Sequence, residues 1–140
     1  MAIKDVMTRG VKVVGPEDPI QLAAQRMADE DIGFVPVCDG ERLVGVITDR
    51  DLAIRAVAKG ADAAGTRVRE VMTDEVTWCF EDEDVDKTAK LMKENDIRRV
   101  VVVSRDKKLV GVVALGDLAQ KQPGHSDDVL EDVSDAPPNK

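Results

Sequence analysis

Short hydrophobic runs alternate with amphipathic segments along most of the chain. A short extended run at residues 11–14 comes first, and an amphipathic segment from Ile20 follows, with apolar residues at a helical period. Two β-rich runs, 34–38 and 43–48, flank a turn, and a second helix is expected to begin near Asp51. The pattern therefore predicts the order β-α-β-β-α.

Local signals sharpen the helix limits in this part of the chain. Asp18 is expected to cap the first helix, with Pro19 at its first position, because a short acceptor side chain and a fixed φ suit those two places. Gly60 is expected to end the second helix, since glycine adopts the left-handed conformation that closes many helices.

The same order recurs in the second half of the chain. An extended run at 76–80, a helix from Val85, two β-rich runs at 100–103 and 109–114 and a helix near Asp117 are expected there. Val6-Met7-Thr8 recurs as Val71-Met72-Thr73, an offset of 65, and the later segments recur at an offset of 66. The extra residue falls in a hairpin turn, 104–108 against 39–42, where an insertion leaves strand pairing intact.

The repeat indicates an α/β protein with two units of similar fold. We expect the first at residues 1–62 and the second at 63–122, each too small for a thick core of its own and therefore packed against the other. Residues 123–140 are polar and acidic and lose the hydrophobic period, so a disordered acidic tail is expected there.

Composition removes several classes of function. The net charge is −8 and aromatic residues make up 2% of the 140 residues, which disfavours a nucleic-acid partner. His125, the single histidine, falls in the polar tail, so neither histidine catalysis nor a zinc site is expected. No apolar run approaches the ~20 residues of a membrane span. Cys38 and Cys79 lie in apolar runs, and we interpret them as buried, unreactive thiols of a cytoplasmic protein.

One motif in each copy carries the candidate chemistry. The first copy has the form Gly-x-x-Thr-x-x-Asp, and the second copy has a variant of it. Thr48 and Asp51 have the spacing of a helix capping box, in which each side chain bonds the other residue's amide. The same carboxylate could accept bonds from two ribose hydroxyls, and free amides at a helix start can hold a phosphate. The two roles are compatible. The second copy keeps Asp117 but has Ala114 at the hydroxyl position, so we expect two unequal sites.

These segments together resemble a pair of CBS domains, also called a Bateman module. The resemblance rests on the repeated Val-Met-Thr openings, on Ile-Gly-Phe-Val-Pro-Val at 32–37 and Ile-Arg-Arg-Val-Val-Val at 97–102, and on Leu-Val-Gly-Val-Ile-Thr-Asp-Arg-Asp at 43–51. It covers about residues 3 to 120. The chain is similar to small bacterial proteins made of little besides such a pair.

The resemblance implies a regulatory module without a catalytic site or catalytic cofactor. Pairs of this family are related by pseudo-two-fold symmetry, commonly bind AMP, ADP, ATP, NAD or S-adenosylmethionine in clefts between the two motifs, and usually form homodimers. It further implies a set of ligand-binding residues. In a first cleft these are Thr48, Asp51, Arg98, Arg99, Val76 and Thr77, and in a second, weaker cleft Asp117, Pro36 and Phe34.

Within the first cleft the resemblance assigns a different part of the ligand to each group. Asp51 is expected to bind the ribose, Thr48 and Arg99 the phosphate, and Val76 and Thr77 the base. Read from the residues alone, Arg98 and Arg99 are equally consistent with a solvated pair after a helix.

We therefore expect a cytoplasmic regulatory module that binds an adenine nucleotide and acts on a protein partner that the sequence does not identify. The alternative is a protein–protein interaction module whose ligand clefts are empty or vestigial. An enzyme is disfavoured because a phosphate-binding glycine loop and a nucleophile–base pair are both missing from the sequence.

Overall fold

The computed structural model describes residues 1–121, and these form two compact units. The Asp51 unit consists of residues 12–76, and the Asp117 unit consists of residues 1–11 together with 77–121. The two sequence repeats thus exchange their opening segments. Residues 6–8 pack with the second repeat, and residues 71–73 pack with the first. The predicted acidic tail, 123–140, lies outside the described residues.

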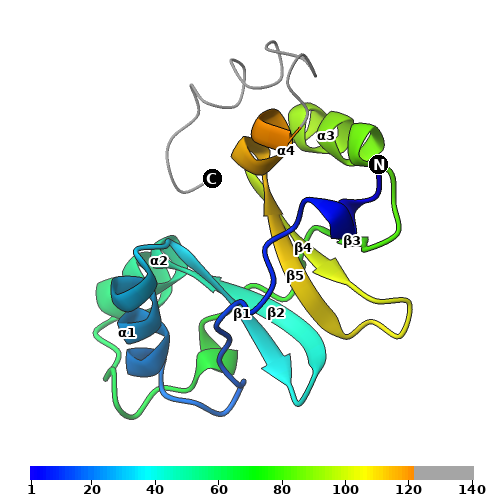
Figure 1. Ribbon diagram of the computed structural model, residues 1–140. Coiled ribbons are helices and arrows are strands. Elements are labelled where there is room, and N and C mark those ends of the chain that lie inside the picture. The colour runs from blue at the N-terminus through cyan, green and yellow to red at the C-terminus, as the bar shows by residue number, and fades with distance from the viewer. Residues whose placement is uncertain (122–140) are drawn as a thin grey trace. The chain divides into compact units, whose positions relative to one another are not determined.

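The Asp51 unit is built on an antiparallel hairpin. Helix α1 and the short helix α2 lie on the same side of this hairpin (Figure 1). In chain order its elements are α1 (Ile20–Glu30), β1 (Phe34–Asp39), β2 (Arg42–Thr48), α2 (Asp49–Asp51), the π-helical turn η2 (Leu52–Ala56) and the 3-10 turns η3 (Val57–Lys59) and η4 (Val68–Glu70). The predicted β-β-α order is confirmed here.

The predicted strand at 11–14 is reduced to a single parallel bridge between Val14 and Val37. The Val14 amide donates to the Pro36 carbonyl at 3.1 Å, and the Cys38 amide donates to the Val14 carbonyl at 2.9 Å. A further bond toward Lys12 would need an amide hydrogen on Pro36, which proline lacks. The ladder therefore stops after one residue.

The start of α1 also differs from the prediction. The helix begins at Ile20, and Pro19 precedes it without a side-chain cap. The Asp18 carboxylate instead accepts from the Gly15 amide at 2.7 Å and so closes the preceding turn. The end of the second helical segment was predicted correctly, because Gly60 has φ +69° and follows η3 directly.

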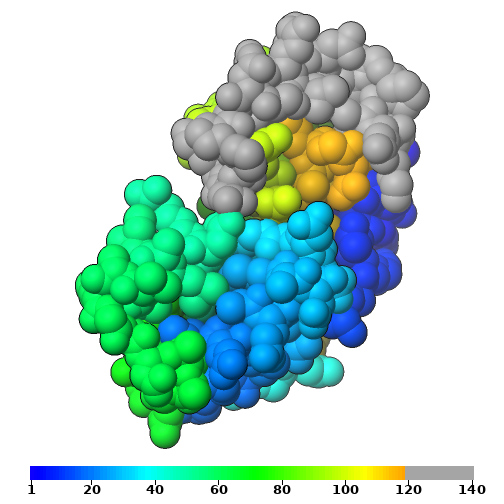
Figure 2. Space-filling model, turned by 90° about the vertical axis from the view of Figure 1, so that its left-hand side faces the viewer, coloured from blue at the N-terminus to red at the C-terminus, as the bar shows by residue number. Residues whose placement is uncertain are grey.

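The core of the Asp51 unit includes one face of α1 and residues from η4. Of the predicted apolar stripe, Ile20, Ala23 and Met27 are buried, whereas Ala24 and Ala28 are exposed. Residues 61–70 run along α1 (Figure 2), and the Ile20 amide donates to the Thr66 carbonyl at 2.9 Å. The buried core residues are Val14, Ile20, Ala23, Met27, Val35, Val37, Ile47, Ala56, Val68 and Val71.

The Asp117 unit contains a three-stranded mixed sheet in the order β3-β4-β5. Strand β3 runs parallel to β4, and β4 runs antiparallel to β5, with α3 and α4 side by side next to the sheet (Figure 1). Its elements are the 3-10 turn η1 (Ile3–Asp5), β3 (Trp78–Phe80), α3 (Val85–Glu94), β4 (Arg99–Val103), β5 (Leu109–Ala114) and α4 (Leu115–Lys121). All five elements predicted for the second copy are present, although β3 is shorter than the predicted run.

The two hairpins share their pairing despite the extra residue. Each contains an irregularity at the same point of the repeat, between Val37 and Cys38 in one and between Val102 and Val103 in the other. The additional residue is accommodated in the second turn, where Lys107 has φ +64°, the value that Gly40 has in the first turn. The prediction that the insertion leaves the strands in register is confirmed.

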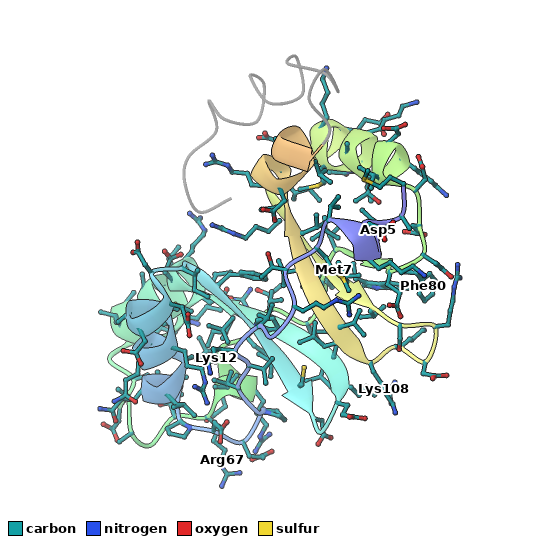
Figure 3. The ribbon with its side chains drawn as sticks, viewed as in Figure 1. Asp5, Met7, Lys12, Arg67, Phe80 and Lys108 are labelled. Atoms are coloured by element: carbon teal, nitrogen blue, oxygen red, sulfur yellow. The ribbon has the colours of Figure 1, made fainter. Side chains whose placement is uncertain are left out.

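The N-terminal segment completes the core of the Asp117 unit. The Ile3 amide donates to the Glu83 carbonyl at 2.9 Å, and Met7 lies against β5 (Figure 3). The buried residues of this core are Ile3, Val6, Met7, Cys79, Val85, Ala89, Met92, Val100, Val102, Val113, Leu115 and Leu118. Ile3 and Val6 here occupy the places that Val68 and Val71 occupy in the Asp51 unit.

The acidic stretch at 81–84 forms the start of α3 and part of the surface beside β3. Asp84 caps α3 by accepting from the Lys87 amide at 3.2 Å. Asp82 accepts two bonds from the Arg105 guanidinium, at 2.7 and 3.0 Å, and this guanidinium lies 4.0 Å from the centre of the Phe80 ring. The Trp78 ring packs edge-on against Phe80 and is 39% exposed.

Candidate functional site

A reciprocal capping box joins Thr48 and Asp51 at the start of α2. The Asp51 amide donates to Thr48 Oγ1 at 3.0 Å, and the Thr48 amide donates to Asp51 Oδ2 at 3.0 Å. Thr48 has an extended backbone, whereas Asp51 is helical, so the chain turns sharply from β2 into α2. The predicted capping role of both residues is confirmed, and it holds the carboxylate in one rotamer.

A third residue, Thr73, binds the same carboxylate. Its hydroxyl lies 3.1 Å from Asp51 Oδ1 and 3.2 Å from Oδ2, so one donor is shared between the two oxygens. Only 8% of Asp51 is exposed. This contact was not predicted from the sequence, although the repeated Val-Met-Thr marks Thr73 as part of a recurring element.

Thr73 is fixed by the backbone of β2. It forms an antiparallel bridge with Val46, in which the Val46 amide donates to the Thr73 carbonyl at 2.9 Å and the Thr73 amide donates back at 2.8 Å. The bridge requires a very close approach, because a Cβ added to Gly45 would lie 2.7 Å from the Thr73 carbonyl oxygen. Gly45 thus permits the contact that brings the Thr73 hydroxyl to Asp51.

Arg55 adds a positive charge beside this cluster. Its Nε lies 3.9 Å from Asp51 Oδ1, and one terminal nitrogen donates to the Met72 carbonyl at 3.1 Å. The side chain of Arg55 is 51% exposed, so solvent screens most of the attraction. The guanidinium therefore acts chiefly as a link between η2 and the segment that carries Thr73.

The equivalent position in the Asp117 unit has only part of this arrangement. The Ala114 amide donates to Asp117 Oδ2 at 3.2 Å, but Ala114 has no hydroxyl with which to return the bond. Thr8 forms the same backbone bridge to Val112 that Thr73 forms to Val46. Among the described residues, however, no hydrogen bond joins the Thr8 hydroxyl to Asp117. The two copies therefore differ in the hydrogen bonds at their acidic residues, and the expected difference in ligand binding stays a prediction.

The residues opposite the two caps also differ in charge. In the paired strands Phe34 lies opposite Thr48, whereas Arg99 lies opposite Ala114, and both Phe34 and Arg99 are half-buried. The carbonyl of Arg98 accepts from the Leu115 amide at 3.0 Å, which ties the start of β4 to the start of α4. Arg98 thus lies just before β4, and Arg99 is the first residue of this strand.

The predicted ligand-binding residues are distributed over both units. Thr48, Asp51, Phe34, Pro36 and Val76 belong to the Asp51 unit, and Asp117, Arg98, Arg99 and Thr77 belong to the Asp117 unit. Pro36 is buried within β1, and the Thr77 carbonyl accepts from the Val101 amide at 3.4 Å.

Both cysteines are buried free thiols, as predicted. Burial raises the pKa of the Cys38 thiol. Burial, and then the negative charge of Glu83, raise the pKa of Cys79 to about 11, while a hydrogen bond with Thr88 opposes the shift. Both groups are therefore protonated near neutral pH, and neither is an activated nucleophile.

The described residues contain neither a metal-binding cluster nor a membrane-spanning helix. Across residues 1–121, no cluster of three or more His, Cys, Asp or Glu side chains has an arrangement that could hold a metal ion. No helix within that range combines the length and hydrophobicity that crossing a bilayer requires.

The two caps allow a reciprocal test of the capping geometry. We expect Thr48→Ala to lower the free energy of unfolding by about 0.5–2 kcal/mol, because a helix-start amide loses its acceptor. Ala114→Thr supplies the missing hydroxyl in the other unit, and it is expected to raise the free energy of unfolding by up to about 1 kcal/mol. Urea unfolding of both variants checks the pair. A loss of stability in Ala114→Thr would contradict a productive capping geometry at Asp117.

Comparison with known proteins reveals close similarity to one family. The model of the CBS domain matches residues 3–57 and 68–124. Hypoxic response protein 1 of Mycobacterium tuberculosis is 36% identical over 124 residues, which span 88% of this chain and 86% of the relative. A crystal structure of Hypoxic Response Protein I with two coordinated zinc ions superposes with a TM-score of 0.78 at 34% identity, covering 88% of this chain and all of that one.

Two further similar structures contain adenosine derivatives. CBSX2 of Arabidopsis thaliana in complex with AMP has a TM-score of 0.74 at 26% identity, covering 86% of this chain and 94% of CBSX2. The CBS domain pair of protein MJ0100, in complex with 5′-methylthioadenosine and S-adenosyl-L-methionine, has a TM-score of 0.72 at 29% identity. That match covers 90% of this chain and 98% of MJ0100's pair.

Proposed function

Because the chain belongs to the CBS-domain family, we propose that it is a regulatory module that senses an adenine nucleotide or a related adenosyl compound. The observation that carries the proposal is the Asp51 carboxylate, which is held in one rotamer at a helix start beside the Thr48 hydroxyl. A carboxylate so placed can accept hydrogen bonds from the two hydroxyls of a ribose. The adenosine derivatives bound by CBSX2 and by the pair of MJ0100 support the ligand class.

The proposal assigns different parts of the ligand to different residues. Asp51 binds the ribose, and the Thr48 hydroxyl contacts a phosphate. Arg99, assisted by Arg98, contributes a guanidinium to the phosphate, for which its planar donor pair is suited. Val76 and Thr77 contact the base.

A second, weaker site is proposed around Asp117, with Pro36 and Phe34. Its weakness follows from Ala114, which lacks the hydroxyl that Thr48 provides, and from Phe34, which lacks the charge of Arg99. At both positions this site lacks a group that would bind a phosphate.

The proposed module acts through a partner protein, without a catalytic step or a catalytic cofactor. The two protonated, buried thiols are consistent with a cytoplasmic, reducing environment.

We also propose a homodimer, supported by the exposed apolar residues Ile54 and Val57, which are 47% and 76% exposed and lie three residues apart on one helical segment. Light scattering distinguishes this dimer from a monomer.

A nucleotide panel tests the function directly. A ligand that binds only the folded protein stabilises it by about 2.7 kcal/mol at a hundredfold excess over Kd, so AMP, ATP, adenosine, 5′-methylthioadenosine or S-adenosylmethionine should raise Tm. Arg99→Ala is expected to weaken the binding of AMP and ATP more than that of adenosine, which has no phosphate. Arg69→Ala, which removes an exposed cation paired with Glu17, is the control. If none of the compounds changes Tm or gives heat in calorimetry, the interaction-module alternative replaces this proposal.

A further inference from the structure

The Thr73 hydroxyl contacts the Asp51 carboxylate, which is the proposed acceptor for the ribose. The hydroxyl contacts both carboxylate oxygens, at 3.1 and 3.2 Å, although the two residues are 22 positions apart in the chain. The bridge to Val46, with two backbone bonds of 2.9 and 2.8 Å, leaves the Thr73 backbone little freedom. The hydroxyl therefore reaches Asp51 from a fixed direction.

The hydrogen bonds within the protein use about half of the acceptor positions of the Asp51 carboxylate. An ionised carboxylate has about four acceptor positions on its two oxygens. The Thr48 amide uses one on Oδ2, and the Thr73 hydroxyl uses one that is shared between Oδ1 and Oδ2. About two positions remain, the number that the 2′- and 3′-hydroxyls of a ribose require. Thr48 and Thr73 together thus fix the rotamer and leave a paired acceptor.

Arg55 reinforces the same geometry from η2. Its bond of 3.1 Å to the Met72 carbonyl ties the residue before Thr73 to the helical segment that follows Asp51. The Met72–Thr73 segment is therefore held twice, at the Asp51 carboxylate by the Thr73 hydroxyl and at η2 by the Arg55 side chain.

The other unit provides an internal comparison. Thr8 repeats the backbone bridge of Thr73, and Gly111 repeats the close approach of Gly45. Thr8 is nevertheless exposed, and in the part of the chain that the structure describes its hydroxyl is not bonded to Asp117. The contact with the carboxylate is thus a property of Thr73 and is not a general consequence of the bridge.

We infer that Thr73 is a positioning residue that makes Asp51 selective for a ribose with both hydroxyls. The inference rests on the proposed function, because it assigns a role within the same site. It also means that a residue of the second repeat's Val-Met-Thr element contributes to the ligand site of the first repeat's Asp51.

Calorimetry on three threonine variants tests the inference. Thr73→Val removes the hydroxyl with little change in volume. It is expected to weaken the binding of AMP about tenfold, because without this bond the Asp51 carboxylate occupies its ribose-binding rotamer only about a tenth of the time. Thr73→Ser restores the donor and should bind AMP within about threefold of the original protein. Thr8→Val, the matched control, should leave AMP affinity unchanged.

Two further measurements separate positioning from a general loss of stability. The ratio of affinities for AMP and 2′,3′-dideoxy-AMP should fall in Thr73→Val, because the analogue lacks the hydroxyls that Asp51 accepts. In an Asp51→Ala background, Thr73→Val should have no additional effect on AMP binding. If Thr73→Val is poorly folded, Thr73→Ala and the Ser variant supply the same comparison.

The outcomes distinguish this inference from the proposed function. If AMP binds and Asp51→Ala weakens it, but Thr73→Val retains both full affinity and the ribose selectivity, Thr73 is not a positioning residue and the function still stands. An equal loss for AMP and the dideoxy analogue in Thr73→Val would likewise overturn the inference. If no adenosyl ligand binds the unaltered protein, the proposed function itself is wrong, and the assignment to Thr73 is wrong with it.

Discussion

Asp51→Ala is expected to weaken AMP binding about tenfold to a hundredfold. The carboxylate is the proposed acceptor for the ribose hydroxyls, and a hydrogen bond to a charged group contributes about 1.5–3 kcal/mol. The variant also loses half of the capping box and the partner of the Thr73 hydroxyl, so Tm must be measured beside the affinity. Asp51→Asn keeps one acceptor oxygen and is expected to bind with intermediate affinity.

Asp117→Ala is the matched control for this prediction. It removes the equivalent carboxylate, but its cap is incomplete because Ala114 cannot return a hydrogen bond. The loss of AMP affinity should therefore be smaller than for Asp51→Ala. Calorimetry in which Asp117→Ala abolishes binding while Asp51→Ala leaves it intact would reverse the assignment of the stronger site.

Gly45→Ala is expected to lower the free energy of unfolding by about 1–3 kcal/mol. The new methyl group would lie 2.7 Å from the Thr73 carbonyl oxygen and 3.1 Å from the Met72 sulfur. The sulfur can move, but the carbonyl belongs to a backbone bridge with two hydrogen bonds, so relief of the clash disturbs that bridge. Because the bridge positions the Thr73 hydroxyl, AMP affinity should fall as well.

Two other glycines separate steric effects from general effects of alanine. Gly111→Ala meets the Thr8 carbonyl oxygen at 2.7 Å and should destabilise the protein similarly, without weakening AMP at Asp51. Gly116 has open space around its Cβ direction and lies in α4, so Gly116→Ala should raise the free energy of unfolding by about 0.5–1 kcal/mol. Urea unfolding in which Gly45→Ala and Gly116→Ala shift stability in the same direction would refute the close-approach argument.

Hydrophobic periodicity was sufficient to predict most elements of both repeats. The strands β1, β2, β4 and β5 and the helices α1 and α3 arise from local patterns, because alternation and helical spacing act within a few residues along the chain. One of the two errors was local, because Asp18 used its carboxylate in the turn before α1. The other was not, because the run at 11–14 pairs beside Pro36, which is distant in the sequence and cannot extend the ladder.

The capping box was predictable for the same reason. Thr48 and Asp51 are three residues apart, so the reciprocal bonds follow from the turn into α2 whatever the rest of the chain does. The inequality of the two copies was likewise readable, since Ala114 has no hydroxyl in any conformation.

Short-range spacing along the chain specifies the repeat, its elements and the Thr48–Asp51 pair. The tertiary structure alone decided which segment packs against which unit and therefore which side chain reaches Asp51. Thr73 arrives from 22 residues away because Gly45 admits its backbone beside Val46, whereas Thr8, in an equivalent bridge, does not bond Asp117 within the described residues. Such a contact depends on how the backbone returns to the strand, and a repeat in the sequence cannot specify it, because both copies carry the same Val-Met-Thr element.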